Sequence, residues 1–289
     1  MSNRNKGILF IILSAFGFAM MSTFVKLSGD LPSFQKTFFR NLVSCVIAFF
    51  MIVYHKESFF GKKENRKTLL LRSAFGTIGI ILNFYAIDHL ILSDANMLNK
   101  LSPFFVIIFC ALFLKEKIKI NQILAVIVAF IGALFIIKPA LNIDMVPYLI
   151  GLCSAIFAAA AYTFVRILGG KEKYYTVVFF FSFFSTVVIL PFFLLTYKPM
   201  TLIQFSYLIL AGVFATIGQF GITLAYKYAP AKEISIFDYS NIIFSAIISM
   251  LLFNQIPDKF SFLGYIIIFS ASFYMFLYNK KLDKVVRKS

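Results

Sequence analysis

One apolar segment of the chain, residues 93–114, carries polar side chains at helical spacing. Asn96, Asn99, Lys100 and Pro103 stand at positions i, i+3, i+4 and i+7, which gathers them on one face of an α-helix. A polar stripe within a bilayer-length helix is unfavourable unless it faces other protein or water. We therefore expect this stripe to line a solute pathway. Lys100 also has the reach to snorkel to the outer interface, and this alternative stays open.

A second apolar segment, residues 230–253, carries a matching stripe of Ser235, Asp238 and Tyr239. An aspartate is too short to reach a membrane interface well, so we expect Asp238 to face the same pathway. A lysine and an aspartate at comparable positions of two helices suit a solute that itself carries both charges.

Three further candidates are polar residues inside apolar segments: Arg40, Asn83 and Gln219. Arg40 is either an interfacial arginine near a helix end or a cation that faces the pathway. In the pathway it would meet a solute carboxylate or pair with Asp238. The two amides would either orient a solute or form packing bonds between helices.

Residues with the chemistry of enzymes are sparse in this sequence. His55 and His89 lie at the ends of apolar segments, with no catalytic triad or metal-ligand grouping around them. The chain lacks a phosphate-binding glycine-rich loop. The cysteines fall in apolar runs and predict buried small side chains, not a disulfide framework: Cys45, Cys110 and Cys153. We expect no enzymatic activity, no cofactor and no metal site.

The composition predicts the elements that position these residues. Hydrophobic residues make up 61% of the 289 residues and charged residues only 14%, against about 25% charged residues in soluble domains. An all-α integral membrane protein is expected, with ten transmembrane helices. Its apolar segments fall at roughly 6–27, 34–54, 68–90, 93–114, 120–138, 146–168, 174–196, 202–226, 230–253 and 259–279.

The net charge of +16 follows from basic residues that cluster in alternate connections between these segments. With the N-terminus inside, the outer connections contain little beyond Lys138, Lys198 and Lys259. The positive-inside rule then places both termini in the cytoplasm, in a multi-pass protein of the cell inner membrane. Because the basic residues are distributed in this way, nucleic acid is not an expected partner.

The two halves of the sequence repeat. A shift of 140 residues places Ser14 on Ser154, and a shift of 139 places Gly79 on Gly218 and Lys100 on Tyr239. We divide the chain into residues 1–140 and 141–289, with five helices each. Five is an odd number, so the second half would cross the membrane in the opposite direction. Inverted repeats of this kind are typical of secondary transporters, which bind solute between the repeats.

Several short motifs resemble the EamA family of the drug/metabolite transporter superfamily, whose members have ten helices in two tandem repeats. They are Phe39-Arg40, Leu101-Ser102-Pro103, Phe113-Leu-Lys-Glu116-Lys117 and Phe253-Asn-Gln-Ile-Pro257-Asp258 with Gly264. Gln255 departs from this pattern, because the family usually has a glutamate there. The resemblance implies a membrane carrier and leaves its solute undefined.

Together, these features predict a secondary transporter that moves a small metabolite by alternating access. An amino acid or amino-acid-like zwitterion is favoured. The alternatives are S-adenosylmethionine, riboflavin or nucleoside-like solutes, or a membrane scaffold or sensor subunit that transports nothing. The expected partners are the solute and the lipid bilayer. The sequence leaves open whether protons drive transport and whether the protein is a monomer or a homodimer.

Overall fold

The computed structural model describes residues 3–114, 119–137, 145–168, 171–229 and 234–286. In the first half, the helices are α1 (Asn3–Leu27), α2 (Ser33–His55), η1 (Lys63–Asn65), α3 (Arg66–His89), α4 (Leu92–Asn99), α5 (Ser102–Leu114) and α6 (Ile120–Ile137). In the second half, they are α7 (Val146–Leu168), α8 (Tyr174–Leu195), α9 (Leu202–Tyr228), η3 (Ser235–Tyr239), α11 (Ser240–Phe253) and α12 (Lys259–Val286). Glu116 and the expected start of the ninth span at residue 230 lie outside these ranges.

Within these ranges, nine helical stretches are long and apolar enough to cross a membrane, and Phe237–Phe253 forms a shorter apolar helix. These stretches coincide with the ten apolar segments expected from the sequence. The predicted all-α membrane fold is therefore confirmed.

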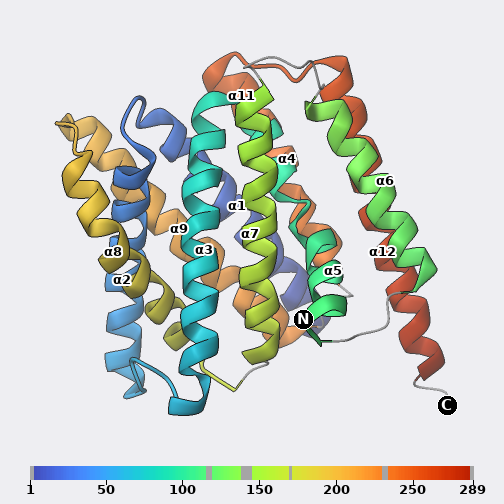
Figure 1. The fold of residues 1–289 in the computed structure, drawn as a ribbon, viewed down its shortest axis with the longest axis horizontal. Coiled ribbons are helices and arrows are strands. Elements are labelled where there is room, and N and C mark those ends of the chain that lie inside the picture. Colours follow the sequence, from blue (N-terminus) through green and yellow to red (C-terminus); the bar gives the residue numbers. More distant parts are fainter. Residues whose placement is uncertain (1–2, 115–118, 138–144, 169–170, 230–233, 287–289) are drawn as a thin grey trace.

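The helix pairs follow the sequence repeat: replacing each helix of a pair by its counterpart in the other half gives a pair that is also present. α1 packs along α9, and its counterpart α7 packs along α3, the counterpart of α9. α2 packs against its own counterpart α8, and α6 against its counterpart α12. Figure 1 shows α2 and α8 at one side, α6 and α12 at the other, and the α1, α3, α7 and α9 helices between them. The centre of the molecule is thus built from both halves.

Small residues let α1 approach α9 closely. A Cβ atom added at Gly17 would lie 2.8 Å from the backbone nitrogen of Gly218. At the same contact, the Ser14 hydroxyl donates a 2.6 Å hydrogen bond to the carbonyl oxygen of Gly218. The counterpart contact lies between α3 and α7, where Gly79 faces the backbone of Ser154 and Ala158. Close approach of this kind supports helix association in lipid, where the hydrophobic effect contributes little.

The expectation of a continuous fourth helix is wrong. α4 ends at Asn99 and α5 begins at Ser102, so Lys100 and Leu101 form a break between them. Pro103 explains the break, because a proline ring clashes with the carbonyl group four residues earlier, here that of Asn99. Proline is favoured within the first turn of the next helix. Pro103 itself is exposed, so the expected single polar face does not include it.

The ninth span is also discontinuous, with the short helix η3 preceding α11. The shift of 139 residues places η3 over the end of α4, so the two irregular segments occupy equivalent places in the repeat. Discontinuous helices at membrane depth are tolerated where protein or water satisfies their free backbone groups.

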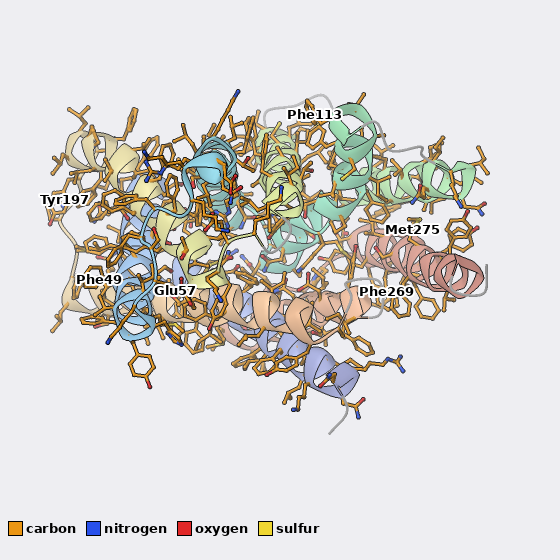
Figure 2. The ribbon with its side chains drawn as sticks, turned by 90° about the horizontal axis from the view of Figure 1, so that it is seen from below. Phe49, Glu57, Phe113, Tyr197, Phe269 and Met275 are labelled. Carbon is orange, nitrogen blue, oxygen red and sulfur yellow. The ribbon has the colours of Figure 1, made fainter. Side chains whose placement is uncertain are left out.

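The outer surface of the bundle is apolar and rich in phenylalanine. Phe49, Phe113 and Phe269 are 42%, 67% and 44% exposed. In Figure 2 these side chains lie at the periphery of the helix bundle. Exposed aromatic and aliphatic side chains on this scale are suited to contact with lipid.

Candidate solute-binding site

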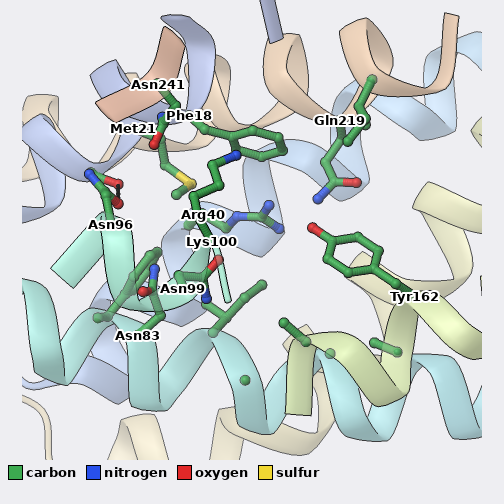
Figure 3. Close-up of a pocket in the computed structure, with 18 of the residues that line it drawn as sticks. Phe18, Met21, Arg40, Asn83, Asn96, Asn99, Lys100, Tyr162, Gln219 and Asn241 are labelled. Atoms are coloured by element: carbon green, nitrogen blue, oxygen red, sulfur yellow. Dashed lines mark hydrogen bonds between the residues drawn. The ribbon is translucent and has the colours of Figure 1, made fainter. Parts of the chain in front are cut away.

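A cavity of about 110 Å³ lies between helices from both halves of the chain. Seven of the candidate residues from the sequence line it together: Arg40, Asn83, Asn96, Asn99, Lys100, Gln219 and Asp238. Figure 3 shows how Arg40, Lys100 and Gln219 converge on this space from different helices. The sequence stripes therefore meet at one place, although they come from segments far apart in the chain.

Lys100 and Asp238 form a salt bridge across the cavity wall. Their side chains are 13% and 18% exposed, so the pair is largely shielded from solvent. Lys100 lies at the C-terminus of α4, and Asp238 lies in η3, which places the two charges at the two helix breaks. The lysine side chain thus points toward Asp238 at the cavity.

Tyr239 completes the contact between the breaks. Its hydroxyl donates a 3.1 Å hydrogen bond to the carbonyl oxygen of Lys100, a group without a helical partner at the end of α4. The Ser272 hydroxyl on α12 donates in turn to the Tyr239 oxygen. Ser235 begins η3, but its side chain lies outside the described part of the structure.

The two asparagines of the α4 stripe bond to neighbouring helices. Asn96 accepts a 3.2 Å hydrogen bond from Ser22 on α1 and donates one of 2.8 Å to Ser245 on α11. The Asn99 amide donates to Ser154 on α7 at 3.2 Å. These bonds hold α4 between the two halves of the molecule, so its amides support the cavity wall as well as lining it.

Arg40 lines the cavity and is buried inside the helix bundle. It is 1% exposed and donates a 2.5 Å hydrogen bond to the side-chain oxygen of Asn41. The Asn41 amide is held in turn by Ser185 on α8, at 2.7 Å. No ion pair joins Arg40 to Asp238 among the described residues, because the aspartate is taken by Lys100.

Arg72 and Tyr162 are among the cavity residues that sequence reasoning missed. Arg72 lies on α3 and is 5% exposed, with its guanidinium carbon 3.7 Å from the ring centroid of Phe181. The available signal was weak, because Arg72 follows Leu69-Leu70-Leu71 near the expected start of the 68–90 segment. Tyr162 comes from α7, and its hydroxyl points toward Arg40 and Gln219 in Figure 3.

The cavity has an excess of positive charge. Three of its lining residues are cations, Arg40, Arg72 and Lys100, whereas Asp238 is the acidic residue among them. The Lys100–Asp238 pair is neutral as a unit, so both arginines remain without a counter-charge in the lining. Such a cavity favours solutes with negative groups.

A bundle of this kind, with a polar cavity between its halves and helices broken at that cavity, defines a membrane transport protein. The chain belongs to the EamA-like transporter family, which it matches over residues 5–138 and again over residues 145–277. The predicted family and its tandem repeat are confirmed, and the chain is a multi-pass membrane protein.

Curated relatives include named transporters, two of which are named for different solutes. The pseudopaline exporter CntI of Pseudomonas aeruginosa is 32% identical over 268 residues, which cover 92% of this chain and 94% of that protein. Human solute carrier family 35 member G1 is 26% identical, with coverage of 87% and 73%. A riboflavin transporter of Brucella anthropi is 27% identical, with coverage of 71% and 75%.

A solved crystal structure supports the fold independently. It superposes with a TM-score of 0.69 at 12% sequence identity and covers 96% of this chain and 99% of that chain. At this identity the similarity establishes the architecture alone.

Proposed function

We propose that this protein is a secondary transporter that moves an amino acid or amino-acid-like zwitterion across the inner membrane by alternating access. The salt bridge between Lys100 and Asp238 carries the proposal. A zwitterion can replace both partners of this ion pair. Its ammonium group would bind Asp238, and its carboxylate would bind Lys100. The exchange leaves no buried charge unpaired, which lowers the electrostatic cost of binding.

The proposed mechanism uses the two halves, residues 1–140 and 141–289, as inverted copies with both termini in the cytoplasm. The cavity of about 110 Å³ has room for a few water molecules. Entry of a metabolite therefore requires the halves to separate on one side. Because Lys100 and Asp238 belong to different halves, breaking their bond removes a contact that holds the halves together. Solute binding is thereby linked to rearrangement of the bundle.

The proposal covers both transport that is coupled to protons and transport that is not coupled to an ion. No catalytic step is part of this proposal.

Riboflavin is a second candidate solute, favoured by the riboflavin transporter among the relatives. Its uncharged ring system has no group that requires both Lys100 and Asp238. Under this alternative, the aromatic residues of the cavity, such as Phe18 and Phe181, would contact the ligand.

A thermal-shift screen of the purified protein tests the proposal. The panel consists of amino acids, S-adenosylmethionine, riboflavin, nucleosides and quaternary amines. A ligand at a hundredfold excess over its Kd stabilises the folded state by about 2.7 kcal/mol. Amino acids should stabilise the wild type, and Asp238→Asn and Lys100→Met should abolish the shift.

Lys171→Met, which changes an exposed lysine, is the control and should retain the shift. Stabilisation by riboflavin alone, unchanged in Asp238→Asn, would replace the proposed solute class. A folded protein that binds none of these solutes and loses only stability in the two cavity variants would favour the scaffold alternative.

A further inference from the structure

We propose that Arg40 and Arg72 form a second anion-binding subsite in the cavity, which takes a side-chain carboxylate of the solute. This inference rests on the proposed function and narrows its solute class to acidic amino-acid-like metabolites, with one more carboxylate than a simple zwitterion. The two arginines come from different helices, α2 and α3, and both line the cavity.

Both guanidinium groups lie against the same aromatic ring. The guanidinium carbons of Arg40 and Arg72 are 5.7 Å and 3.7 Å from the ring centroid of Phe181 on α8. A cation over an aromatic face is stabilised by the ring quadrupole. The ring therefore brings two like charges to one place, which is unfavourable unless an anion joins them.

The hydrogen-bonding groups of the arginines are incompletely used. Among the described residues, Nε of Arg40 and both Nε and Nη1 of Arg72 have no hydrogen-bond partner. The side chains are 1% and 5% exposed, so bulk water does not compensate them fully. Buried polar groups are normally hydrogen-bonded, and unpartnered donors at a cavity indicate a ligand that completes them.

These hydrogen-bond donors favour an anionic ligand. Arginine stays protonated in proteins, so burial leaves its charge in place. No carboxylate of the described chain forms a salt bridge with either arginine, and the acid of the cavity lining is bound to Lys100. The planar guanidinium fork matches the two oxygens of a carboxylate, and Tyr162 brings a further hydroxyl to the cavity.

The local structure preserves room for this subsite. A Cβ atom at Gly76, one turn after Arg72, would lie 3.2 Å from Nη1 of Arg72 and 3.0 Å from Cε2 of Phe181. The glycine therefore leaves the guanidinium group space to lie on the ring. Arg40 is oriented by its 2.5 Å bond to Asn41. Both cations are thus held in position before a solute arrives.

L-Glutamate and L-glutamine provide a matched pair of probes, since they differ only in the distal carboxylate or amide. Ligand-induced thermal shifts of the purified protein should show tighter binding of glutamate than of glutamine by about 10- to 100-fold, the range of a charge-assisted hydrogen-bond pair. Arg72→Met and Arg40→Met should each abolish the preference for glutamate over glutamine, measured as the ratio of the two affinities in the same variant.

Two further variants separate recognition from packing. Arg72→Lys keeps the charge but loses the planar fork, and we expect it to retain part of the preference. Phe181→Leu removes the ring but leaves both guanidinium groups, and it should lower the melting temperature while glutamate remains preferred. Equal affinity of the wild type for the two probes, or a preference unchanged in Arg72→Met, would overturn the subsite.

Succinate distinguishes failure of the subsite from failure of the proposed function, because it has carboxylates without an ammonium group. Stabilisation by succinate that is lost in Arg72→Met, with no response to any amino acid, would keep the subsite and reject the amino-acid transporter. Stabilisation through Arg72 by inorganic phosphate, with none by glutamate or succinate, would overturn the carboxylate assignment. No response to any of these probes would reject both proposals.

Discussion

The hydroxyl of Tyr239 donates a 3.1 Å hydrogen bond to the carbonyl oxygen of Lys100. This bond joins the break in the fourth span to η3 of the ninth span, at positions that the sequence repeat aligns with each other. The second half thus supplies a hydrogen-bond donor for the irregular backbone of the first half. The charges that we assign to solute binding lie directly beside this contact, in Lys100 and Asp238.

Tyr239→Phe should destabilise the protein by about 1 kcal/mol, the scale of an interhelical hydrogen bond in a membrane protein. The carbonyl oxygen of Lys100 loses its hydrogen-bond donor, and the position of Lys100 relative to Asp238 becomes less fixed. Thermal unfolding in detergent measures the first effect, and solute affinity measures the second. Tyr274→Phe, which changes an exposed tyrosine of α12, is the matched control. Equal melting temperatures for the two variants would contradict this role.

Gly17→Ala should destabilise the α1–α9 contact by about 1–3 kcal/mol, the range of overpacked substitutions. The added Cβ would lie 2.8 Å from the backbone of Gly218, and backbone has little freedom to move away. Gly151→Ala serves as the control, because its added Cβ would lie 3.1 Å from the end of the flexible Leu98 side chain. In thermal unfolding, the melting temperature of Gly17→Ala should be well below that of Gly151→Ala. The reverse order would refute the prediction.

Lys36→Met should destabilise the protein by about 3 kcal/mol, because the largely buried carboxylate of Asp88 loses its ion-pair partner. Lys36 is fully buried and forms a 2.5 Å salt bridge with Asp88, which joins α2 to α3. It also donates a 2.7 Å hydrogen bond to the carbonyl oxygen of Gly29. Denaturation of the purified variant measures the loss. Lys171→Met should have little effect, since Lys171 is exposed, and equal effects of both changes would contradict the prediction.

Contacts between connections at the two ends of the bundle should control access to the cavity. At one end, a carboxylate oxygen of Glu172 accepts hydrogen bonds from the backbone of Lys62 at 2.9 Å and from Asn65 at 2.6 Å. At the other end, Gln35 bonds to the backbone of Lys198 through both its amide oxygen and its amide nitrogen, each at 3.1 Å. By the sequence repeat, the two connections that meet at one end are the counterparts of the two that meet at the other end.

Glu172→Ala should therefore open the cavity toward one side of the membrane and Gln35→Ala toward the opposite side. An Ile80→Cys variant without the native cysteines reports access, because Ile80 lines the cavity. In the proposed orientation, with both termini in the cytoplasm, a membrane-impermeant maleimide should label it faster from the cytoplasmic side in Glu172→Ala and from the outer side in Gln35→Ala. Faster labelling from the same side in both variants would contradict the arrangement.

The sequence was sufficient to predict the membrane fold, because a bilayer requires long apolar helices and a repeated pattern survives in small polar residues. It also indicated the pairing of stripes that places Lys100 near Asp238. The break at Lys100 was harder to anticipate, since helical spacing alone treats Asn96 to Pro103 as one face. Pro103 was the available signal, through its conflict with the carbonyl of Asn99.

Arg72 shows why the charge balance of the site escaped sequence analysis. It lies near the predicted start of an apolar segment, where an arginine normally belongs to the interface. Only the packing of α3 against α8 places it on Phe181 and into the cavity. For the same reason, the sequence left the position of Arg40 undecided between interface and cavity.

Counterflow in proteoliposomes tests the central claim most directly. Vesicles loaded with unlabelled L-glutamate should accumulate external radiolabelled glutamate when they contain the wild-type protein. Vesicles with folded Asp238→Asn should not, because the ammonium group has lost its counter-charge. Accumulation by Asp238→Asn at the wild-type rate, or its absence with the wild type for every amino acid tested, would contradict transport of a zwitterion through the Lys100–Asp238 site.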